Sequence, residues 1–227
     1  MPPRTALVAG ATGLVGSLCL KQLIADPAYD RVIAISRRPV PESHPKLILK
    51  IVDFDKLGQL TSIAADDAFC ALGTTIRKAG SQEAFREIDA GYSKAFAELA
   101  LASGARQFAL VSSVGANARS TNFYLRTKGE IEDAVKALTF TSVHIFQPGF
   151  LVGSRSEHRP GEGIGLALAN ALQFAFISGL RKYRSILASI VAAAMIAAVK
   201  RTEPGRHTYL FDDMQALAKQ LTSPNPP

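Results

Sequence analysis

The sequence is poor in cysteine and lacks any residue pattern typical of a metal site. Cys19 and Cys70 are the only cysteines among 227 residues, and both lie inside apolar stretches. A secreted scaffold held by disulfides is therefore excluded, and a reduced, cytoplasmic compartment is favoured. The four histidines are widely separated, and there is no H-E-x-x-H or C-x-x-C pair, so no metal centre is predicted.

Signals for hydrolysis, secretion and membrane spanning are also missing. The chain has no G-x-S-x-G turn and no lysine placed as in a phosphate-binding loop. No apolar stretch precedes a cleavage site near Met1, so we expect no signal peptide. Two apolar segments, residues 164–180 and 186–199, are shorter than the roughly 20 residues of a membrane span. We expect buried helices there instead.

The net charge of +7 is spread along the chain rather than gathered in one run. The longest basic cluster, Arg181-Lys182-Tyr183-Arg184, is too short for a polybasic tail. We therefore expect no nucleic-acid partner. Part of the basic excess is available for a phosphorylated cofactor.

Apolar runs and amphipathic segments alternate as far as Phe146. Continuous apolar runs indicate buried parallel strands, and segments with helical periodicity indicate the crossovers between them. The predicted strands cover residues 5–9, 31–36, 46–52, 67–72, 107–112 and 140–146, and the predicted helices cover residues 14–25, 56–65, 81–103 and 123–138. The pattern predicts an α/β fold with a doubly wound parallel, Rossmann-like sheet.

The regular alternation ends at Pro148, where a glycine-rich loop begins. We expect one domain over residues 1–227, with a small helical C-terminal cap over about residues 151–206 that contributes to substrate binding. A late strand is expected at residues 208–211, and a frayed tail from Thr222 onward.

The first predicted strand continues directly into a glycine-rich turn that opens the first helix. Glycines permit a tight turn and a close approach of the backbone to a pyrophosphate, which the helix N-terminus also favours. Glycine clusters also form ordinary turns, but this one has a strand before it and a helix after it. The turn predicts nucleotide binding by Gly10, Thr12, Gly13, Leu14, Val15 and Gly16.

Basic residues follow the second predicted strand, where an NAD-selective site would carry an acidic residue for the ribose 2′-hydroxyl. The chain has Ser36-Arg37-Arg38 at this position. Two guanidinium groups suit a 2′-phosphate through charge and geometry, so NADP(H) is favoured over NAD. The alternative interpretation is an exposed loop that happens to be basic. Asp53 and Phe54, after the third strand, are expected to flank the adenine.

Tyr124 and Lys128 lie four residues apart on a predicted helix, so their side chains share one face. A nearby ammonium stabilises a phenolate and so makes a tyrosine a better proton donor or acceptor at neutral pH. A serine at the end of the preceding strand can hydrogen-bond a substrate carbonyl. We expect Ser112, Tyr124 and Lys128 to be catalytic, with Ser113 as the alternative to Ser112.

Together these motifs resemble the short-chain dehydrogenase/reductase superfamily in its atypical branch. More narrowly, the chain is similar to the Tat-interactive-protein-type oxidoreductases and their small bacterial relatives. The segments that carry the resemblance are Gly10–Gly16, Ser36-Arg37-Arg38, Cys70-Ala71-Leu72-Gly73-Thr74-Thr75, Ser112-Ser113-Val114-Gly115-Ala116, Tyr124–Glu130 and Gln147-Pro148-Gly149.

The resemblance implies an NADP-binding Rossmann domain in which Tyr124 exchanges the proton and Ser112 orients the carbonyl. Lys128 would modulate the acidity of the phenol and bind the nicotinamide ribose. The turn Leu72-Gly73-Thr74-Thr75 would face the cofactor ribose and pyrophosphate, and Pro148 would line the nicotinamide pocket. The chain departs from the family pattern in a slightly short Ser–Tyr spacing and in Asp89, where many relatives have an asparagine that relays protons.

We therefore expect a cytoplasmic, NADP(H)-dependent oxidoreductase that transfers hydride to or from a small-molecule carbonyl or alcohol. Its oligomeric state, monomer or homodimer, stays open. The alternative is a catalytically weak module that senses NADPH and binds a regulatory partner. The intact pair of Tyr124 and Lys128 favours the enzyme, because a pure sensor has no physical need for both.

Overall fold

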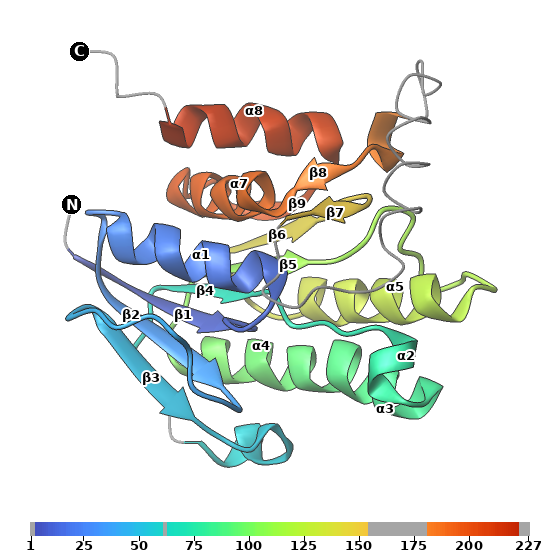
Figure 1. The fold of residues 1–227 in the computed structure, drawn as a ribbon, viewed down its shortest axis with the longest axis horizontal. Helices are drawn as coiled ribbons and strands as arrows, with labels where there is room; N and C mark the ends of the chain where they lie inside the picture. The colour runs from blue at the N-terminus through green and yellow to red at the C-terminus, as the bar shows by residue number, and fades with distance from the viewer. Residues whose placement is uncertain (1–2, 61–62, 154–180, 223–227) are drawn as a thin grey trace.

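Seven parallel strands form the centre of the computed structural model, which describes residues 3–60, 63–153 and 181–222 (Figure 1). The strand order is β3-β2-β1-β4-β5-β6-β9. The strands are β1 (Arg4–Ala9), β2 (Tyr29–Ser36), β3 (Leu47–Ile51), β4 (Asp67–Cys70), β5 (Gln107–Val111), β6 (Ser142–Phe146) and β9 (Gly205–Tyr209). The doubly wound parallel sheet is confirmed. The late strand lies at Gly205–Tyr209 rather than at residues 208–211.

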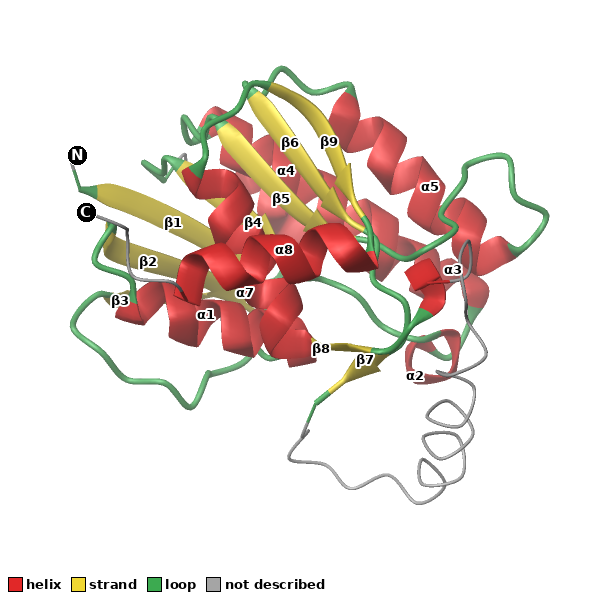
Figure 2. Ribbon diagram, turned by 90° about the horizontal axis from the view of Figure 1, so that it is seen from above, coloured by secondary structure: helices red, strands yellow, loops and turns green. Residues whose placement is uncertain are grey.

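Helices cover both faces of this sheet (Figures 1 and 2). One face carries α1 (Leu14–Ala25) and α7 (Ala188–Lys200), with α8 (Phe211–Thr222) lying over α7; the other carries α4 (Tyr92–Ala102) and α5 (Phe123–Lys136). Successive strand residues point to opposite faces. Leu7 and Val8, for example, are both fully buried but pack into different apolar clusters. This two-sided burial explains why the strands are continuously apolar.

The described part of the predicted cap region, residues 151–206, lies mostly in the main layers of the fold. The alanine-rich helix α7 belongs to the main layers, because it packs between α1 and α8, and β9 pairs with β6 in the sheet. The remaining described elements are β7 (Leu151–Val152), η3 (Arg181–Tyr183) and β8 (Ile186–Leu187), and β7 and β8 form a separate parallel pair. Residues 154–180, with the apolar segment 164–180, lie outside the described residues, so the single domain over residues 1–227 stays a prediction.

The predicted long helix over residues 81–103 is divided into three parts. It consists of α3 (Gln82–Arg86), a π-helical turn η2 (Glu87–Gly91) and α4, and a short helix α2 (Ile76–Ala79) precedes it. The predicted helix over residues 56–65 is only a 3₁₀ helix, η1 (Phe54–Gln59). None of the helices within the described ranges is long and apolar enough to cross a membrane.

A buried histidine joins the last strands of the sheet. His144 on β6 is fully buried, with its Nε2 3.1 Å from Oε1 of Gln107 and its Nδ1 3.0 Å from the hydroxyl of Tyr209. Its ring also stacks on His207 of β9, with centroids 5.2 Å apart. Because the Gln107 oxygen can only accept, a neutral imidazole that donates from Nε2 and accepts at Nδ1 satisfies both contacts. Burial, with the charges of His207 and Arg201, lowers the pKa of His144 to about 4.

This pKa predicts a loss of stability in acid. The native pKa lies below the ordinary histidine value of 6.5, so the unfolded chain takes up this proton first as the pH falls. The stabilisation is complete above pH about 6.5 and is lost as the pH falls toward about 4. Across that window, we expect the wild type to lose up to about 3 kcal/mol relative to His144→Gln.

Urea unfolding at several pH values measures this difference, with His44→Gln as the control for removal of an exposed histidine. A constant difference between wild type and His144→Gln across the window would contradict the prediction.

Candidate functional site

The glycine turn between β1 and α1 is packed too closely for larger residues. Gly10 has a left-handed φ of +86°, and a Cβ there would lie 2.4 Å from the carbonyl oxygen of Ala71. A Cβ on Gly16 would lie 2.0 Å from the carbonyl oxygen of Gly10. Real Cβ atoms do not approach oxygen so closely, so helix α1 can sit directly on its own turn only because both positions are glycine.

The N-terminus of α1 presents backbone donors at this turn. Gly13 precedes the helix and supplies no side-chain cap. Within the described ranges, the N–H groups of Leu14, Val15 and Gly16 have no acceptor. Unpaired donors and the helix dipole together attract an anion. Thr12 is exposed on the same turn.

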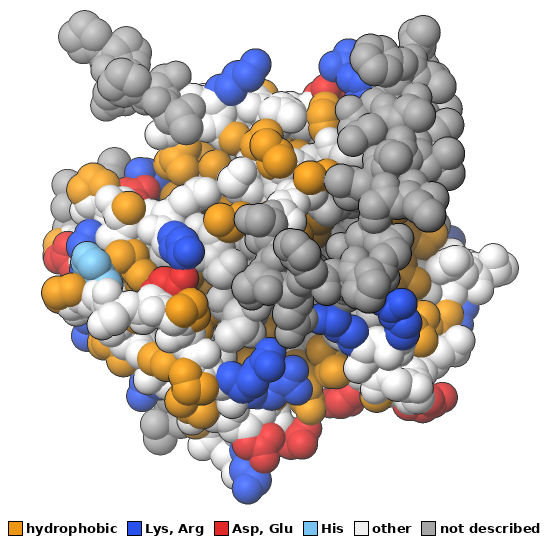
Figure 3. All heavy atoms as spheres, viewed as in Figure 1, with side chains coloured by type: hydrophobic (Ala, Val, Ile, Leu, Met, Phe, Trp, Pro, Cys, Tyr) orange, Lys and Arg blue, Asp and Glu red, His pale blue; other side chains and the backbone are white. Residues whose placement is uncertain are grey.

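The end of β2 carries the predicted 2′-phosphate residues. The Ser36 hydroxyl donates to the carbonyl of Arg38 at 2.7 Å and accepts the N–H of Arg38 at 3.2 Å, which closes a tight turn. Arg37 and Arg38 are both exposed. Figure 3 shows basic side chains gathered over the carboxyl ends of β1 and β2. The serine therefore shapes the loop, and the two guanidinium groups remain available to a ligand.

The two residues expected beside the adenine differ in exposure. Asp53 is exposed and accepts the N–H of Asp55 at 3.2 Å, which caps η1. Phe54 is only 4% exposed and lies in the core, with the Arg37 guanidinium 5.8 Å from its ring centroid. The structure thus places Phe54 beneath Arg37 as a support, and the cation–π contact restrains the guanidinium.

The turn after β4 lies against the glycine turn and against two helices. Leu72 is half-buried, and its backbone N lies 2.8 Å from the Cβ position of Gly10. The N–H of Thr74 donates to Oδ2 of Asp89 at 2.8 Å, and the Thr75 hydroxyl accepts the N–H of Lys78 at 3.2 Å to cap α2. Gly73, between them, is exposed.

Helix α5 carries the predicted proton-transfer pair. Asn122 caps the helix by accepting the N–H of Leu125 at 3.1 Å. Tyr124 is half-buried, with its ring centroid 5.6 Å from that of Phe85. Lys128 is buried, and its ammonium lies 2.6 Å from Oδ1 of Asp89. The cap fixes the start of the helix, and the ion pair fixes the lysine one turn further along.

The end of β5 holds the two candidate serines in different surroundings. Ser112 is buried, and its hydroxyl donates to Oε1 of Glu132 at 2.5 Å. Glu132 is itself 3% exposed and also accepts from Gln147 at 2.8 Å and from Lys136 at 3.2 Å. Ser113 is half-buried, and its side chain has no hydrogen-bond partner among the described residues.

The loop after β6 closes the same edge of the sheet. Pro148 is buried, and its carbonyl accepts the N–H of Val114 at 3.0 Å. A Cβ on Gly153, after β7, would lie 2.9 Å from Cδ1 of Leu14. The loop therefore runs from the end of β5 to the N-terminus of α1. The predicted site residues come together at the carboxyl edge of the sheet, and their roles stay predictions.

Sequence reasoning missed Glu132 and the contact of Asp89 with Lys128. A signal for Glu132 was present, because Tyr124, Lys128 and Glu132 follow one another at intervals of four along α5. The partners of Asp89 could not be found this way, because they depend on how α5 and the turn after β4 pack together.

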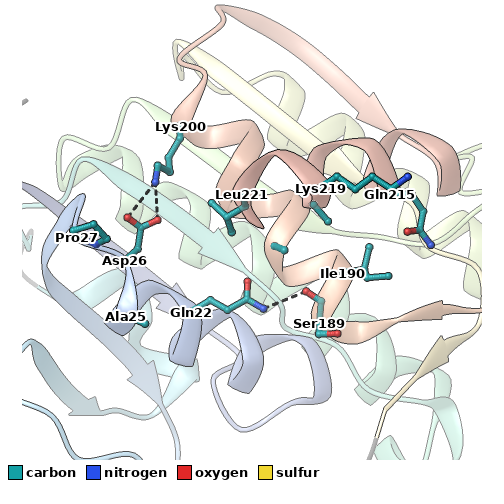
Figure 4. Close-up of a pocket in the computed structure, with 12 residues that line it drawn as sticks. Gln22, Ala25, Asp26, Pro27, Ser189, Ile190, Lys200, Gln215, Lys219 and Leu221 are labelled. Carbon is teal, nitrogen blue, oxygen red and sulfur yellow. Dashed lines mark hydrogen bonds and ion pairs between the residues drawn. The ribbon is translucent and has the colours of Figure 1, made fainter. Parts of the chain in front are cut away.

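A hollow of about 670 Å³ lies away from this edge, between α1, α7 and α8 (Figure 4). It adjoins the C-terminal end of α1, where Lys200 pairs with Asp26 at 2.8 Å and Gln22 donates to the carbonyl of Ser189 at 3.2 Å. The glycine turn is at the opposite end of that helix. Across the described part of the chain, no group of three or more His, Cys, Asp or Glu residues is placed to hold a metal ion.

Comparison with known proteins assigns the family. The model of the NAD dependent epimerase/dehydratase family matches residues 6–144. The chain belongs to this family. It is similar to protein HTATIP2 of Rattus norvegicus, with 36% identity over 184 residues that cover 79% of this chain and 76% of that protein. It is also similar to the mitochondrial protein FMP52 of Candida albicans, with 35% identity over 185 residues, 78% of this chain and 81% of that protein.

Solved structures of other proteins share the fold. Human epimerase family protein SDR39U1, solved with NADPH, superposes with a TM-score of 0.63 and 16% identity, covering 91% of this chain and 74% of that one. MoeE5, solved with UDP-glucose and NAD, gives a TM-score of 0.67 and 17% identity, covering 96% and 82%. With the relatives above, these matches confirm the resemblance to the atypical short-chain dehydrogenase/reductase superfamily.

The expected cytoplasmic location is contradicted by the fungal members of the family. Relatives at 33–40% identity in Candida albicans, Emericella nidulans, Candida glabrata and Coccidioides immitis are all named as mitochondrial. The prediction rested on scarce cysteine. That scarcity shows only that the fold needs no disulfides, and it does not distinguish one intracellular compartment from another.

The packing of the glycine turn predicts the effect of one added methyl group. Gly16→Ala places a Cβ against the carbonyl of Gly10, so either the turn or α1 must shift. We expect a loss of about 1–3 kcal/mol in the free energy of unfolding and at least a tenfold weaker affinity for NADPH.

Urea unfolding and fluorescence titration with NADPH measure the two effects. Gly58→Ala is the control, because a Cβ on Gly58 meets nothing within 4 Å. Equal affinities in the two variants would contradict the role of the turn.

Proposed function

We propose that the protein is an NADP(H)-dependent oxidoreductase that transfers hydride to or from a small carbonyl or alcohol. The observation that carries the proposal is the placement of Tyr124 and the buried Lys128 on one face of α5, beside the turn after β4. A phenol next to an ammonium, at the edge where dinucleotides bind in doubly wound sheets, is suited to exchange one proton. Membership of an NAD-dependent family supports a nicotinamide cofactor.

The residues at the carboxyl edge fit a phosphorylated dinucleotide. The close-packed glycines and the unpaired N–H groups of Leu14, Val15 and Gly16 suit the pyrophosphate. Arg37 and Arg38 suit a 2′-phosphate, and no acidic residue stands at the end of β2 to favour NAD. SDR39U1 is solved with NADPH and MoeE5 with NAD, so the preference for NADP(H) rests on Arg37 and Arg38.

The chain's own residues would handle the proton and orient the substrate. The nicotinamide, when bound, supplies or accepts the hydride. Tyr124 donates its phenolic proton to the oxygen that becomes an alcohol, or accepts the proton in the reverse direction. Lys128 stabilises the phenolate and binds the ribose hydroxyls of the cofactor. Pro148, which is buried, would limit water at the nicotinamide.

The surroundings of the two serines favour Ser113 over Ser112 as the hydroxyl that orients the carbonyl. A serine has one proton to donate, and Ser112 gives its proton to the carboxylate of Glu132. A developing negative charge on a substrate oxygen requires a donor. The Ser113 hydroxyl retains its proton for that role within the described structure.

Replacement of the phenol tests the reaction. We expect Tyr124→Phe to lower kcat by at least about 100-fold, because general acid–base catalysis contributes on that scale. NADPH affinity should stay within about twofold, because the ring and its packing on Phe85 are kept.

NADPH oxidation across a panel of aldehydes, ketones and quinones measures the rate. Wild-type turnover that survives in Tyr124→Phe would refute the proton role. If the wild type oxidises NADPH with none of these compounds but still binds the cofactor at micromolar concentration, the NADPH-sensing module is favoured.

The basic loop after β2 makes the cofactor preference testable. We expect the double variant Arg37→Ala with Arg38→Ala to lose at least about 100-fold in affinity for NADPH and little for NADH, because it removes two charge-assisted contacts, each worth about 1.5 kcal/mol or more.

Calorimetric titration with both cofactors measures the ratio. Arg31→Ala is the matched control, since Arg31 is exposed near the opposite end of the same strand. Equal losses for NADPH and NADH would contradict 2′-phosphate recognition.

A further inference from the structure

A buried ion pair lies directly beneath the turn after β4. The side chains of Asp89 and Lys128 are 0% and 7% exposed, and Oδ1 of Asp89 is 2.6 Å from Nζ of Lys128. A Cβ on the exposed Gly73 would lie 3.5 Å from that oxygen and 3.7 Å from that nitrogen. The other oxygen of Asp89 accepts the N–H of Thr74 at 2.8 Å. Asp89 therefore ties Lys128 to the turn that borders the candidate cofactor site.

A local break in the helix aims Asp89 at this place. Asp89 is the central residue of the π-helical turn Glu87–Gly91, which interrupts the helical stretch between α3 and α4. A π-turn widens the helix by one residue and is frequent at functional sites. The segment just before the π-turn also contacts α5 outside the site, where Arg86 at the end of α3 pairs with Glu130 at 2.9 Å. That pair is exposed, whereas the pair of Asp89 and Lys128 is not.

The charge of Lys128 depends on its neighbours. Burial alone would drive a lysine toward the neutral amine. Among the residues that the structure describes, three titratable groups face it: Asp89 from η2, Tyr124 from α5 and Cys70 from β4. Burial is the largest single influence and lowers the pKa of Lys128. The opposing effects of Asp89, first, and of Tyr124 and Cys70 together exceed it, and the net direction is upward. Burial also raises the pKa of Cys70 to about 11, so that thiol is uncharged at neutral pH and Asp89 supplies the negative charge.

We propose that Asp89 is a positioning residue that keeps Lys128 charged and holds its ammonium beside Tyr124 and the Gly73–Thr74 turn. The inference rests on the proposed function and names Asp89 as the group that maintains the charge of Lys128 in it. An asparagine at this position would still accept the N–H of Thr74 but would supply no charge. Charge and hydrogen bonding at position 89 can therefore be separated by one substitution.

The experiment is a pH titration of Tyr124 by ultraviolet difference absorbance, which reports tyrosinate without any turnover. The chain has five tyrosines, so each spectrum is corrected with the matching Tyr124→Phe protein. A hydrogen bond to Asp55 raises the pKa of Tyr92 to about 12, and burial does the same for Tyr209. Burial also raises the pKa of Tyr29 well above its ordinary value. These three tyrosines therefore ionise only at high pH, and subtraction of the Tyr124→Phe spectrum isolates the Tyr124 signal.

Four proteins are compared with the wild type. We expect Asp89→Asn to raise the midpoint of Tyr124 ionisation by at least about one pH unit, toward the value of Lys128→Met, because an uncompensated buried lysine loses its proton. Asp89→Glu, which keeps the carboxylate, should stay near the wild type. Glu130→Gln is the matched control, because it removes a carboxylate that also joins α5 to the segment before η2 but does not contact Lys128.

An unchanged or lowered midpoint in Asp89→Asn would overturn the proposal. If Asp89→Asn does not fold, nuclear magnetic resonance of lysine labelled at Nζ decides the question in the wild type, with the Lys128 signal assigned by its loss in Lys128→Met. A Lys128 that titrates below the ordinary lysine value would then overturn the proposal.

Failure of the proposed function has a different signature. It would appear as silence in the NADPH-oxidation panel while these titrations behave as expected.

Discussion

The parallel direction of all seven strands is the constraint on which the site depends. Parallel strands bring every carboxyl end to one edge, so residues far apart in the chain meet there. Hydrogen bonds between loops then fix their spacing, as when Val114 donates to the carbonyl of Pro148. The glycine turn can join this edge only because Gly10 and Gly16 leave room for the backbone. The fold thus assembles the candidate site before any side-chain chemistry is considered.

Two buried carboxylates hold the functional face of α5 in place. Asp89 anchors Lys128, and Glu132 anchors Ser112 at the end of β5. A buried charge is costly unless it is paired and hydrogen-bonded, and both carboxylates have several partners. The helix is therefore fixed on one side to the turn after β4 and on the other to the ends of β5 and β6. The proposed proton-transfer pair would need this rigidity, because small misplacements of reacting groups reduce the rate strongly.

The sequence predicted the sheet well because buried parallel strands leave a plain apolar signal, and all six early strands formed within a few residues of their expected bounds. It failed where tertiary packing decides. The π-turn at Glu87–Gly91 lies within a stretch of continuous helical periodicity, so the pattern gives no sign of it. The buried helix expected over residues 186–199 is present as α7, but its place between α1 and α8 depends on packing. Helix α8 itself was missed, although Asp212 and Asp213 mark its first turn.

The site residues divide in the same way, between those found from local sequence patterns and those that depend on tertiary packing. Motif positions such as Gly10, Tyr124 and Lys128 were found from local spacing, and the structure brings them to one edge. Asp89, the partner of Lys128, lies on η2, which only the fold brings to α5, and Glu132 reaches Ser112 only because α5 packs against the end of β5. Local patterns identify which groups are present, whereas the protonation and direction of each group depend on long-range contacts.

The small turn closed by Ser36 has a consequence for redesign of the cofactor preference. Its hydroxyl acts as donor and acceptor to the backbone of Arg38 at once, a pair of contacts that an ionised carboxylate cannot make because it has no proton to give. An aspartate introduced at position 36 to attract an unphosphorylated ribose would therefore also break the contacts that close the loop carrying both arginines. Exchange of one dinucleotide for the other therefore requires redesign of residues 36–38 together, because Ser36 stands at the candidate specificity position and also closes the turn.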